Sequence, residues 1–203
     1  MELFSHIRVD NAAKKTIVLF HGTGGDEKDL LIFNDELRDL YNFIGLRGNV
    51  TEHGMNRFFI RDESGVFDQD NIKIEADKLY AFTNHLIENN GILRENIFFL
   101  GYSNGANIIL ASIFYHPDIV QHAVLLHPML PFAPKTELLD LKRLSCFVSL
   151  GVSDEIVSFK DSVAVISGLK SCGADVTIKE YPSGHQITRE EFRDVVDFCR
   201  KQT

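Results

Sequence analysis

The segment NIFFLGYSNGANIILASIF, residues 96–114, indicates the fold more clearly than any other part of the chain. An apolar run, IFFL, is followed by GYSNG and then by ANIILASIF, an apolar stretch with the length of a helix. A short run of large apolar residues is typical of a buried strand, and the glycines mark a tight turn. The sequence therefore predicts a buried strand that turns sharply into a helix, with Ser103 in the turn.

The same alternation of strand and helix extends along the rest of the chain. Buried strands are predicted over residues 15–22, 96–103, 121–128 and 144–151, a weaker strand over 41–48, and an edge-like strand over 175–181. Helices are predicted over residues 72–90, 105–116 and 159–170, and a last helix begins at the capping box TREE, residues 188–191. Buried strands that alternate with helices form a mostly parallel sheet covered on both faces.

One segment, residues 45–71, has no clear hydrophobic periodicity. A long irregular loop in a compact domain is either functional or contains secondary structure that the pattern does not reveal. The chain has 203 residues and no linker or repeat, which predicts a single domain over residues 1–203.

Charge and cysteine content limit the function classes. The net charge of −8 argues against nucleic acid as a partner, because phosphates would be repelled. Three widely spaced cysteines, with no metal-binding spacing, favour reduced thiols in a cytoplasmic protein and no metal site. We expect no signal peptide and no stable membrane insertion, since no apolar stretch approaches 20 residues.

GYSNG matches G-x-S-x-G, which at a strand-to-helix turn forms a nucleophile elbow. A serine hydroxyl needs a base to take its proton and a carboxylate to orient that base. Asp154 follows one later strand and His185 follows the next, so the order along the chain is Ser103, Asp154, His185. Glu155 is the rival carboxylate. This order is the one expected of an α/β-hydrolase.

A tetrahedral oxyanion needs two convergent N–H donors. The first is expected from Asn104, directly after the nucleophile, and the second from Thr23 or Gly24 in the glycine-rich loop FHGTGGDEKDL. A phosphate-binding loop is the competing interpretation of HGTGG. It is disfavoured because the Lys-Ser/Thr of a P-loop and the GxGxxG spacing are both missing.

Four motifs together, LFHGTGGDEKDL, FFLGYSNGANI, GVSDEIV and SGHQI, resemble the phospholipase/carboxylesterase family of α/β-hydrolases. The resemblance extends from about Thr16 to the last helix and implies a serine esterase without a cofactor. Acyl-protein thioesterases of this family typically carry a GFSQG-like elbow, so GYSNG places the chain nearer the bacterial carboxylesterases. The implied substrates are small or medium acyl esters, with thioesters and lysophospholipids also open. A homodimer is left open too.

The substrate-binding residues are predicted less directly. Met55, Phe58 and Phe59 could line an acyl pocket or could anchor the loop at 45–71 to the core. His127 is a hydrogen-bonded wall residue or part of the pocket. The segment 127–144 is too short for a bulky helical lid, so we expect an open site. Alternative functions are a dienelactone-hydrolase-like enzyme, which would usually carry cysteine at the elbow, and a binding module that has lost catalysis.

Overall fold

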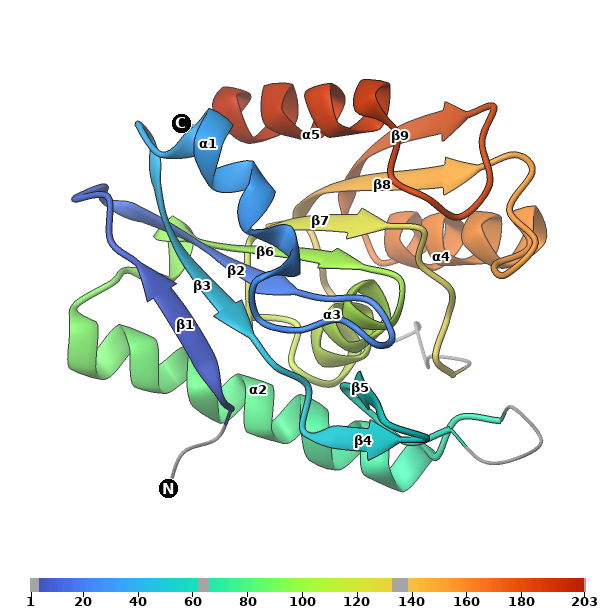
Figure 1. Cartoon of the computed structure of the whole chain (residues 1–203), viewed down its shortest axis with the longest axis horizontal. Helices are drawn as coiled ribbons and strands as arrows, with labels where there is room; N and C mark the ends of the chain where they lie inside the picture. The colour runs from blue at the N-terminus through green and yellow to red at the C-terminus, as the bar shows by residue number, and fades with distance from the viewer. Residues whose placement is uncertain (1–3, 62–65, 133–138, 203) are drawn as a thin grey trace.

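The computed structural model describes residues 4–61, 66–132 and 139–202, and its centre is a seven-stranded sheet (Figure 1). The strands lie in the order β1-β3-β2-β6-β7-β8-β9, and all neighbours are parallel except β1 and β3. Their bounds are His6–Val9 for β1, Lys15–Phe20 for β2, Tyr41–Leu46 for β3, Ile97–Tyr102 for β6, His122–Leu126 for β7, Ser145–Gly151 for β8 and Asp175–Tyr181 for β9.

Helices cover both faces of this sheet, as the sequence predicts. On one face lie α2 (Gln69–Asn90), α3 (Asn104–Tyr115) and α4 (Phe159–Ser171). The other face is covered by α5 (Arg189–Lys201) together with the short helices η1 (Asp29–Phe33) and α1 (Asn34–Leu37). Side chains of β2 alternate between the two cores, with Val18 in one and Ile17 in the other. A further short helix, η2, spans Arg94–Asn96.

Each predicted strand and helix is confirmed within a few residues. The strand at 175–181 is an edge strand, and the capping box of α5 is present, with Thr188 and Glu191 bonded to each other's backbone N–H groups. The edge strand β1 was not predicted, because its HIRV sequence is half polar. The short helices η1 and α1 were also missed.

The irregular segment 45–71 contains a small hairpin, β4 (Val50–Glu52) paired with β5 (Met55–Arg57). Residues 62–65 of this segment lie outside the described residues. The prediction of a minimal lid concerns residues 127–144, of which 133–138 lie outside the described residues as well.

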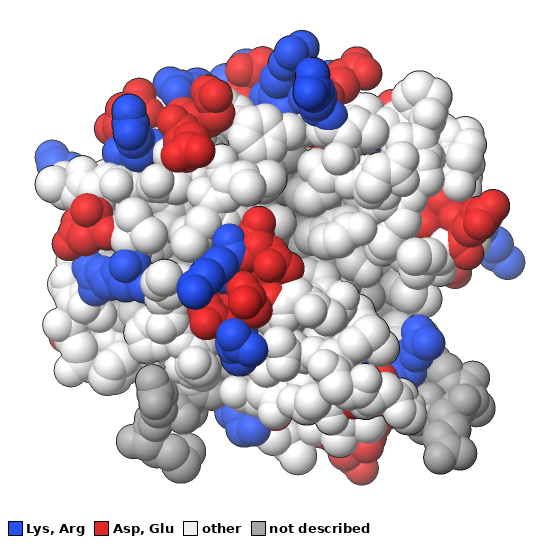
Figure 2. Space-filling view, in the orientation of Figure 1, with Lys and Arg blue, Asp and Glu red and all other residues white. Residues whose placement is uncertain are grey.

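On the face drawn in Figure 2, basic and acidic side chains occur in small mixed groups separated by broad uncharged areas. No basic stripe crosses that face. Among the helices in the described ranges, none combines the length and apolar character needed to cross a bilayer.

Candidate active site

The nucleophile elbow is formed between β6 and α3. Ser103 has φ of 52°, a left-handed conformation that a non-glycine residue rarely adopts outside functional turns. A Cβ on Gly101 would lie 2.7 Å from the carbonyl oxygen of Gly105, and a Cβ on Gly105 would collide with the carbonyl of Phe20. The two glycines therefore allow strand and helix to approach closely enough for the serine to stand at the turn.

The three predicted triad residues meet at the carboxyl end of the sheet. Nε2 of His185 lies 2.9 Å from Oγ of Ser103, and Nδ1 of His185 lies 2.7 Å from Oδ2 of Asp154. Ser103 follows β6, Asp154 follows β8 and His185 follows β9. Because parallel strands end at one edge, three residues far apart in the sequence come within hydrogen-bond distance.

Asp154 is fixed at both of its oxygens. Its Oδ1 accepts the backbone N–H groups of Ile156 and Val157, each at 2.9 Å, while Oδ2 faces His185. Burial alone would raise the pKa of Asp154, but the hydrogen bonds from Val157, His185 and Ile156 outweigh it and hold that pKa below its usual range. The rival Glu155 is exposed, and the hydrogen bonds of the His185 ring go to Asp154 and Ser103 instead.

The expected oxyanion donors surround Ser103, with one exception. The N–H of Gly24 donates to the carbonyl of Asn56 at 2.9 Å, so it is already used. For the N–H groups of Thr23 and Asn104 we find no acceptor among the described residues, and Asn104 N–H opens α3, where no helical partner exists. Thr23 and Asn104 therefore fit the donor role better than Gly24.

A hollow of about 400 Å³ opens above the serine and forms the candidate substrate pocket. Met55 from β5 and Ile156 from the loop after β8 give it apolar surface, and both are exposed. The pocket residues are Thr23, Glu52, His53, Met55, Arg57, Arg61, Tyr102, Ser103, Ile156 and His185. A larger hollow of about 700 Å³ lies beside α5, but none of the three triad residues lines it.

Two predicted substrate contacts do not fit their positions. Phe58 and Phe59 are completely buried and line no part of the pocket, which corresponds to the anchoring alternative. The Phe58 ring packs on Phe20, and its backbone N–H donates to Oδ1 of Asn104 at 2.7 Å. Phe58 thus supports the elbow residue Asn104, and the Phe59 ring packs on Phe67.

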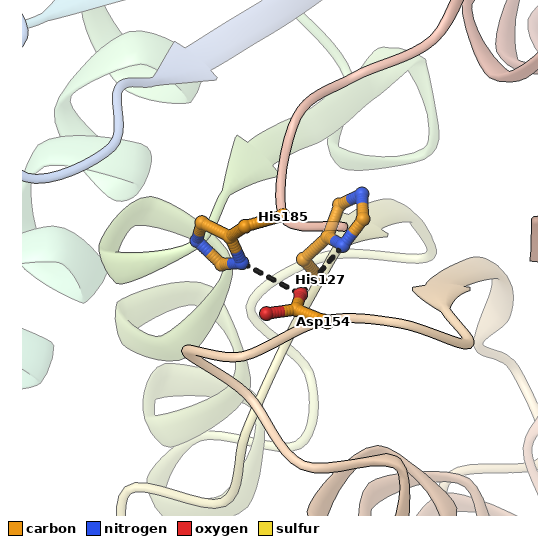
Figure 3. A group of neighbouring side chains, drawn as sticks. All are labelled: His127, Asp154 and His185. Carbon is orange, nitrogen blue, oxygen red and sulfur yellow. Dashed lines mark hydrogen bonds and ion pairs between the residues drawn. The ribbon is translucent and has the colours of Figure 1, made fainter. Parts of the chain in front are cut away.

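His127 does not line the pocket either, and its position corresponds to the hydrogen-bonded alternative. Its side chain is fully buried behind the triad, with Nδ1 3.0 Å from Oδ2 of Asp154 and Nε2 3.3 Å from Oε2 of Glu191. Figure 3 shows His127 and His185 meeting the same oxygen of Asp154.

Two supporting residues were missed by sequence reasoning. Tyr102, the second residue of GYSNG, donates its hydroxyl to the carbonyl of His185 at 2.8 Å and so holds the loop of the base. Arg57 donates to Oγ1 of Thr23 at 3.1 Å. The position of Tyr102 inside the elbow motif was the one signal available for either of them.

His127, Asp154 and His185 are also a set of residue types that can bind a metal. Their facing atoms are 2.7 and 3.0 Å apart, which are hydrogen-bond distances. A tetrahedral zinc ion with bonds of about 2.0–2.1 Å would hold its ligand atoms roughly 3.3 Å apart. The spacing fits bridging protons better than a bridging metal.

Comparisons with known proteins agree with this geometry. The sequence matches the Phospholipase/Carboxylesterase family over residues 4–203. A Bacillus subtilis (strain 168) protein named "Putative hydrolase MhqD" is 34% identical over 186 residues, which cover 92% of each chain. The crystal structure of the Bacillus cereus carboxylesterase has a TM-score of 0.91 and 32% identity, covering 100% of this chain and 96% of that one. A carboxylesterase from Mesorhizobium loti has a TM-score of 0.89 and 28% identity, covering 98% of this chain and 95% of that one.

The family match includes nearly every residue, and the similar proteins are a hydrolase and carboxylesterases that share the whole fold. The chain therefore belongs to the phospholipase/carboxylesterase family of α/β-hydrolases and is an ester hydrolase of the serine esterase type.

Proposed function

We propose that Ser103, His185 and Asp154 hydrolyse small and medium acyl esters through an acyl-enzyme. The observation that carries this proposal is the unbroken hydrogen-bond chain from Oγ of Ser103 through His185 to Asp154. Near the serine, the backbone N–H groups of Thr23 and Asn104 donate to no acceptor among the described residues. A nucleophile, a base, an orienting carboxylate and an oxyanion site are the parts that acyl transfer needs.

In acylation, Oγ of Ser103 attacks the ester carbonyl carbon while Nε2 of His185 takes the hydroxyl proton. The carbonyl electron pair moves onto oxygen, and the resulting oxyanion accepts the N–H groups of Thr23 and Asn104. Asp154 stabilises the imidazolium that forms. When the intermediate collapses, the bond to the alcohol oxygen breaks, His185 returns its proton to that oxygen, and the alcohol leaves.

In deacylation, water takes the place of the alcohol. His185 removes a proton from water as the water oxygen attacks the acyl carbon, and the same two N–H groups hold the second oxyanion. Collapse breaks the bond to Oγ of Ser103, which takes the proton back from His185. The products are the carboxylic acid and the free serine.

The pocket favours modest acyl groups. Its volume of about 400 Å³ is near the lower end for small-molecule sites, and only part of its wall is apolar. Met55 and Ile156 are its two exposed aliphatic side chains. Acetate to hexanoate esters suit this wall better than long lipid chains, and the choice between oxygen esters and thioesters belongs to the test below.

A fluorophosphonate probe followed by intact-protein mass spectrometry tests the nucleophile. We expect one adduct per chain, located on Ser103 by peptide mapping, and no adduct on Ser103→Ala. Ser153→Ala is the matched control, because Ser153 lies in the loop of Asp154 but has no contact with His185. A panel of p-nitrophenyl esters and matching thioesters then ranks the substrates. Labelling at another serine, or none, would overturn the proposal.

A cytoplasmic setting is part of the same proposal and is supported by the thiols. Cys146, Cys172 and Cys199 are buried, and none of them forms a disulfide bond within the described residues. Burial raises the pKa of Cys146 and of Cys199 to about 12, so these thiols are poor nucleophiles at neutral pH. This chemistry suits a reducing compartment, and it leaves Ser103 as the nucleophile of the site.

A further inference from the structure

Behind the triad, one imidazole lies between two buried carboxylates. Nδ1 of His127 is 3.0 Å from Asp154, and Nε2 is 3.3 Å from each of the two oxygens of Glu191. The side chains of His127 and Glu191 are fully buried, and that of Asp154 is nearly so. Figure 3 shows His127 and His185 as neighbours that both meet the Asp154 carboxylate, and their ring centroids are 5.2 Å apart.

The number of N–H groups on the His127 ring determines whether both carboxylates receive a hydrogen bond from it. A neutral imidazole has one N–H, so one ring nitrogen would turn a lone pair toward a carboxylate oxygen. A doubly protonated ring donates at both nitrogens. Glu191 adds to this need. Its Oε2 also accepts the N–H of Thr188, while its Oε1 has no hydrogen bond among the described residues and lies 3.3 Å from Nε2 of His127. A buried carboxylate oxygen without a donor is costly.

The backbone also points to a required position for this ring. His127 has φ of 50°, one of four positive values at non-glycine residues among the described residues, and Ser103 has another. Leu126, directly before it, accepts the N–H of Ser103 at 2.9 Å. The end of β7 thus contacts the nucleophile with its backbone and the triad carboxylate with its side chain. Strain of this kind concentrates at functional sites.

We propose that His127 is a positioning residue that carries a proton on both ring nitrogens, joins Glu191 to Asp154, and sets the charge felt by the base His185. This inference rests on the proposed esterase mechanism, which it deepens. The triad then becomes part of a five-residue chain from Glu191 through His127, Asp154 and His185 to Ser103.

The charges around His185 determine how readily this base takes up a proton, so a change at His127 should affect it. With both carboxylates ionised and both ring nitrogens of His127 protonated, the buried groups next to the base carry one net negative charge. Tyr102, which packs beside His185, keeps its proton, because burial and the nearby carboxylates raise its pKa to about 12. The other titratable groups near His185 line the pocket and are the same in all variants compared below: Glu52, His53, Arg57 and Arg61. Removing the charge of His127 leaves two negative charges, which stabilise the imidazolium of His185 and keep the base protonated to higher pH.

The first experiment reads the protons directly. Long-range ¹H–¹⁵N NMR of the whole protein at pH 7.5 distinguishes protonated from bare ring nitrogens, without any need for activity. We expect both nitrogens of His127 to be protonated, and one of them to lose its proton in Glu191→Gln. Glutamine still supports the capping box, so α5 keeps its N-terminus. A bare nitrogen on His127 in the unmutated protein would overturn the proposal.

The second experiment reads the effect on the base. In His127→Asn the amide can still donate to Asp154 from the position of Nδ1, but the charge is gone. We expect the acidic limb of kcat/KM for an acetate ester to move up by about one pH unit. Adding Glu191→Gln removes the second negative charge and should return the limb to within about 0.3 unit of the original.

A purely structural role predicts a different pattern. In that case His127→Asn lowers kcat and the melting temperature while the acidic limb stays in place, and this outcome would overturn the inference. His122→Asn is the matched control, since His122 lies at the opposite end of β7 and faces neither carboxylate. If His127→Asn fails to fold, the NMR result for Glu191→Gln decides. Failure of the esterase proposal is recognised separately, as the absence of fluorophosphonate labelling at Ser103.

Discussion

The catalytic residues and the pocket wall border the same space but are held in different ways. Ser103, His185 and Asp154 are joined by contacts of 2.9 and 2.7 Å, and the two oxygens of Asp154 are both engaged. On the wall, Met55 is 41% exposed and Ile156 is 69% exposed. The groups proposed to perform the reaction are therefore fixed by several hydrogen bonds, whereas the side chains proposed to meet the acyl chain are largely exposed.

This difference follows from the fold. The catalytic residues follow directly on strands of the central sheet, whose positions are set by two hydrophobic cores. The wall comes from the short hairpin β4–β5 and from the loop after β8. Side chains on such segments can change without disturbing the sheet, so chemistry and substrate preference should respond to mutation separately.

The largest effect is expected at the nucleophile. Ser103→Ala should reduce kcat for a p-nitrophenyl acetate substrate by about 10⁶-fold, because no acyl-enzyme can form. The melting temperature should change little, since alanine leaves the elbow glycines and the core intact. Steady-state kinetics beside thermal unfolding measure both. If the folded variant retains more than a few per cent of the activity, Ser103 is not the nucleophile.

The triad was predictable because each member is marked by local sequence. Ser103 lies in GYSNG, and Asp154 and His185 each follow a recognisable strand. The supporting chain was not predictable in the same way. Glu191 is recognisable as part of a capping box, but its contact with His127 requires α5 to lie beside the end of β7, and no local pattern carries that information.

The second prediction tests whether Phe58 belongs to the hydrophobic core or to the wall of the pocket. Phe58→Ala removes a completely buried ring that packs against Phe20 and His21, and we expect the free energy of unfolding to fall by about 3–5 kcal/mol. Because the ring does not line the pocket, acetate, butyrate and octanoate esters should lose kcat/KM to the same extent. A loss that grows with chain length would return Phe58 to the substrate site.

A smaller effect concerns stability and pH. Burial alone would lower the pKa of His127, but the Glu191 and Asp154 carboxylates outweigh it and raise that pKa above the usual imidazole value. A raised pKa contributes stability that is fully present below about pH 6.5 and is lost as the pH rises through the value in the folded protein.

Glu191→Gln should therefore lower the free energy of unfolding by about 1–2 kcal/mol near pH 6, and the difference should narrow toward pH 9. Denaturant unfolding of both proteins at several pH values measures it. A difference that is constant with pH would mean that Glu191 acts only through the helix cap.

The wall was the least predictable part of the site. Met55, Phe58 and Phe59 looked equivalent in the sequence, yet Phe58 and Phe59 are buried while Met55 lines the pocket. Met55 lies in β5, which ends at Arg57, whereas Phe58 and Phe59 follow the strand. Both phenylalanines are buried although they are adjacent, so neither a strand period nor a helix period would have separated them from Met55.

The smallest effect is expected at Met55 itself. Its thioether chain lies beside the oxyanion loop, where a Cβ on Gly24 would be 3.7 Å from Cγ of Met55, so it can contact the acyl chain near the reacting carbon. Met55→Ala removes the three side-chain groups beyond Cβ that can touch the acyl chain. Burying each group against the substrate contributes at most ~0.8 kcal/mol to binding, and the contribution is smaller here because the side chain stays partly exposed. We expect the preference for hexanoate over acetate to fall by roughly three- to tenfold, with an unchanged melting temperature. Ile156→Ala, in the loop after β8, is the matched variant and should act in the same direction. If Met55→Ala instead lowers kcat/KM for all esters equally, Met55 supports the oxyanion loop and does not bind substrate. The distinction between catalytic residues and pocket wall would then not hold at this residue.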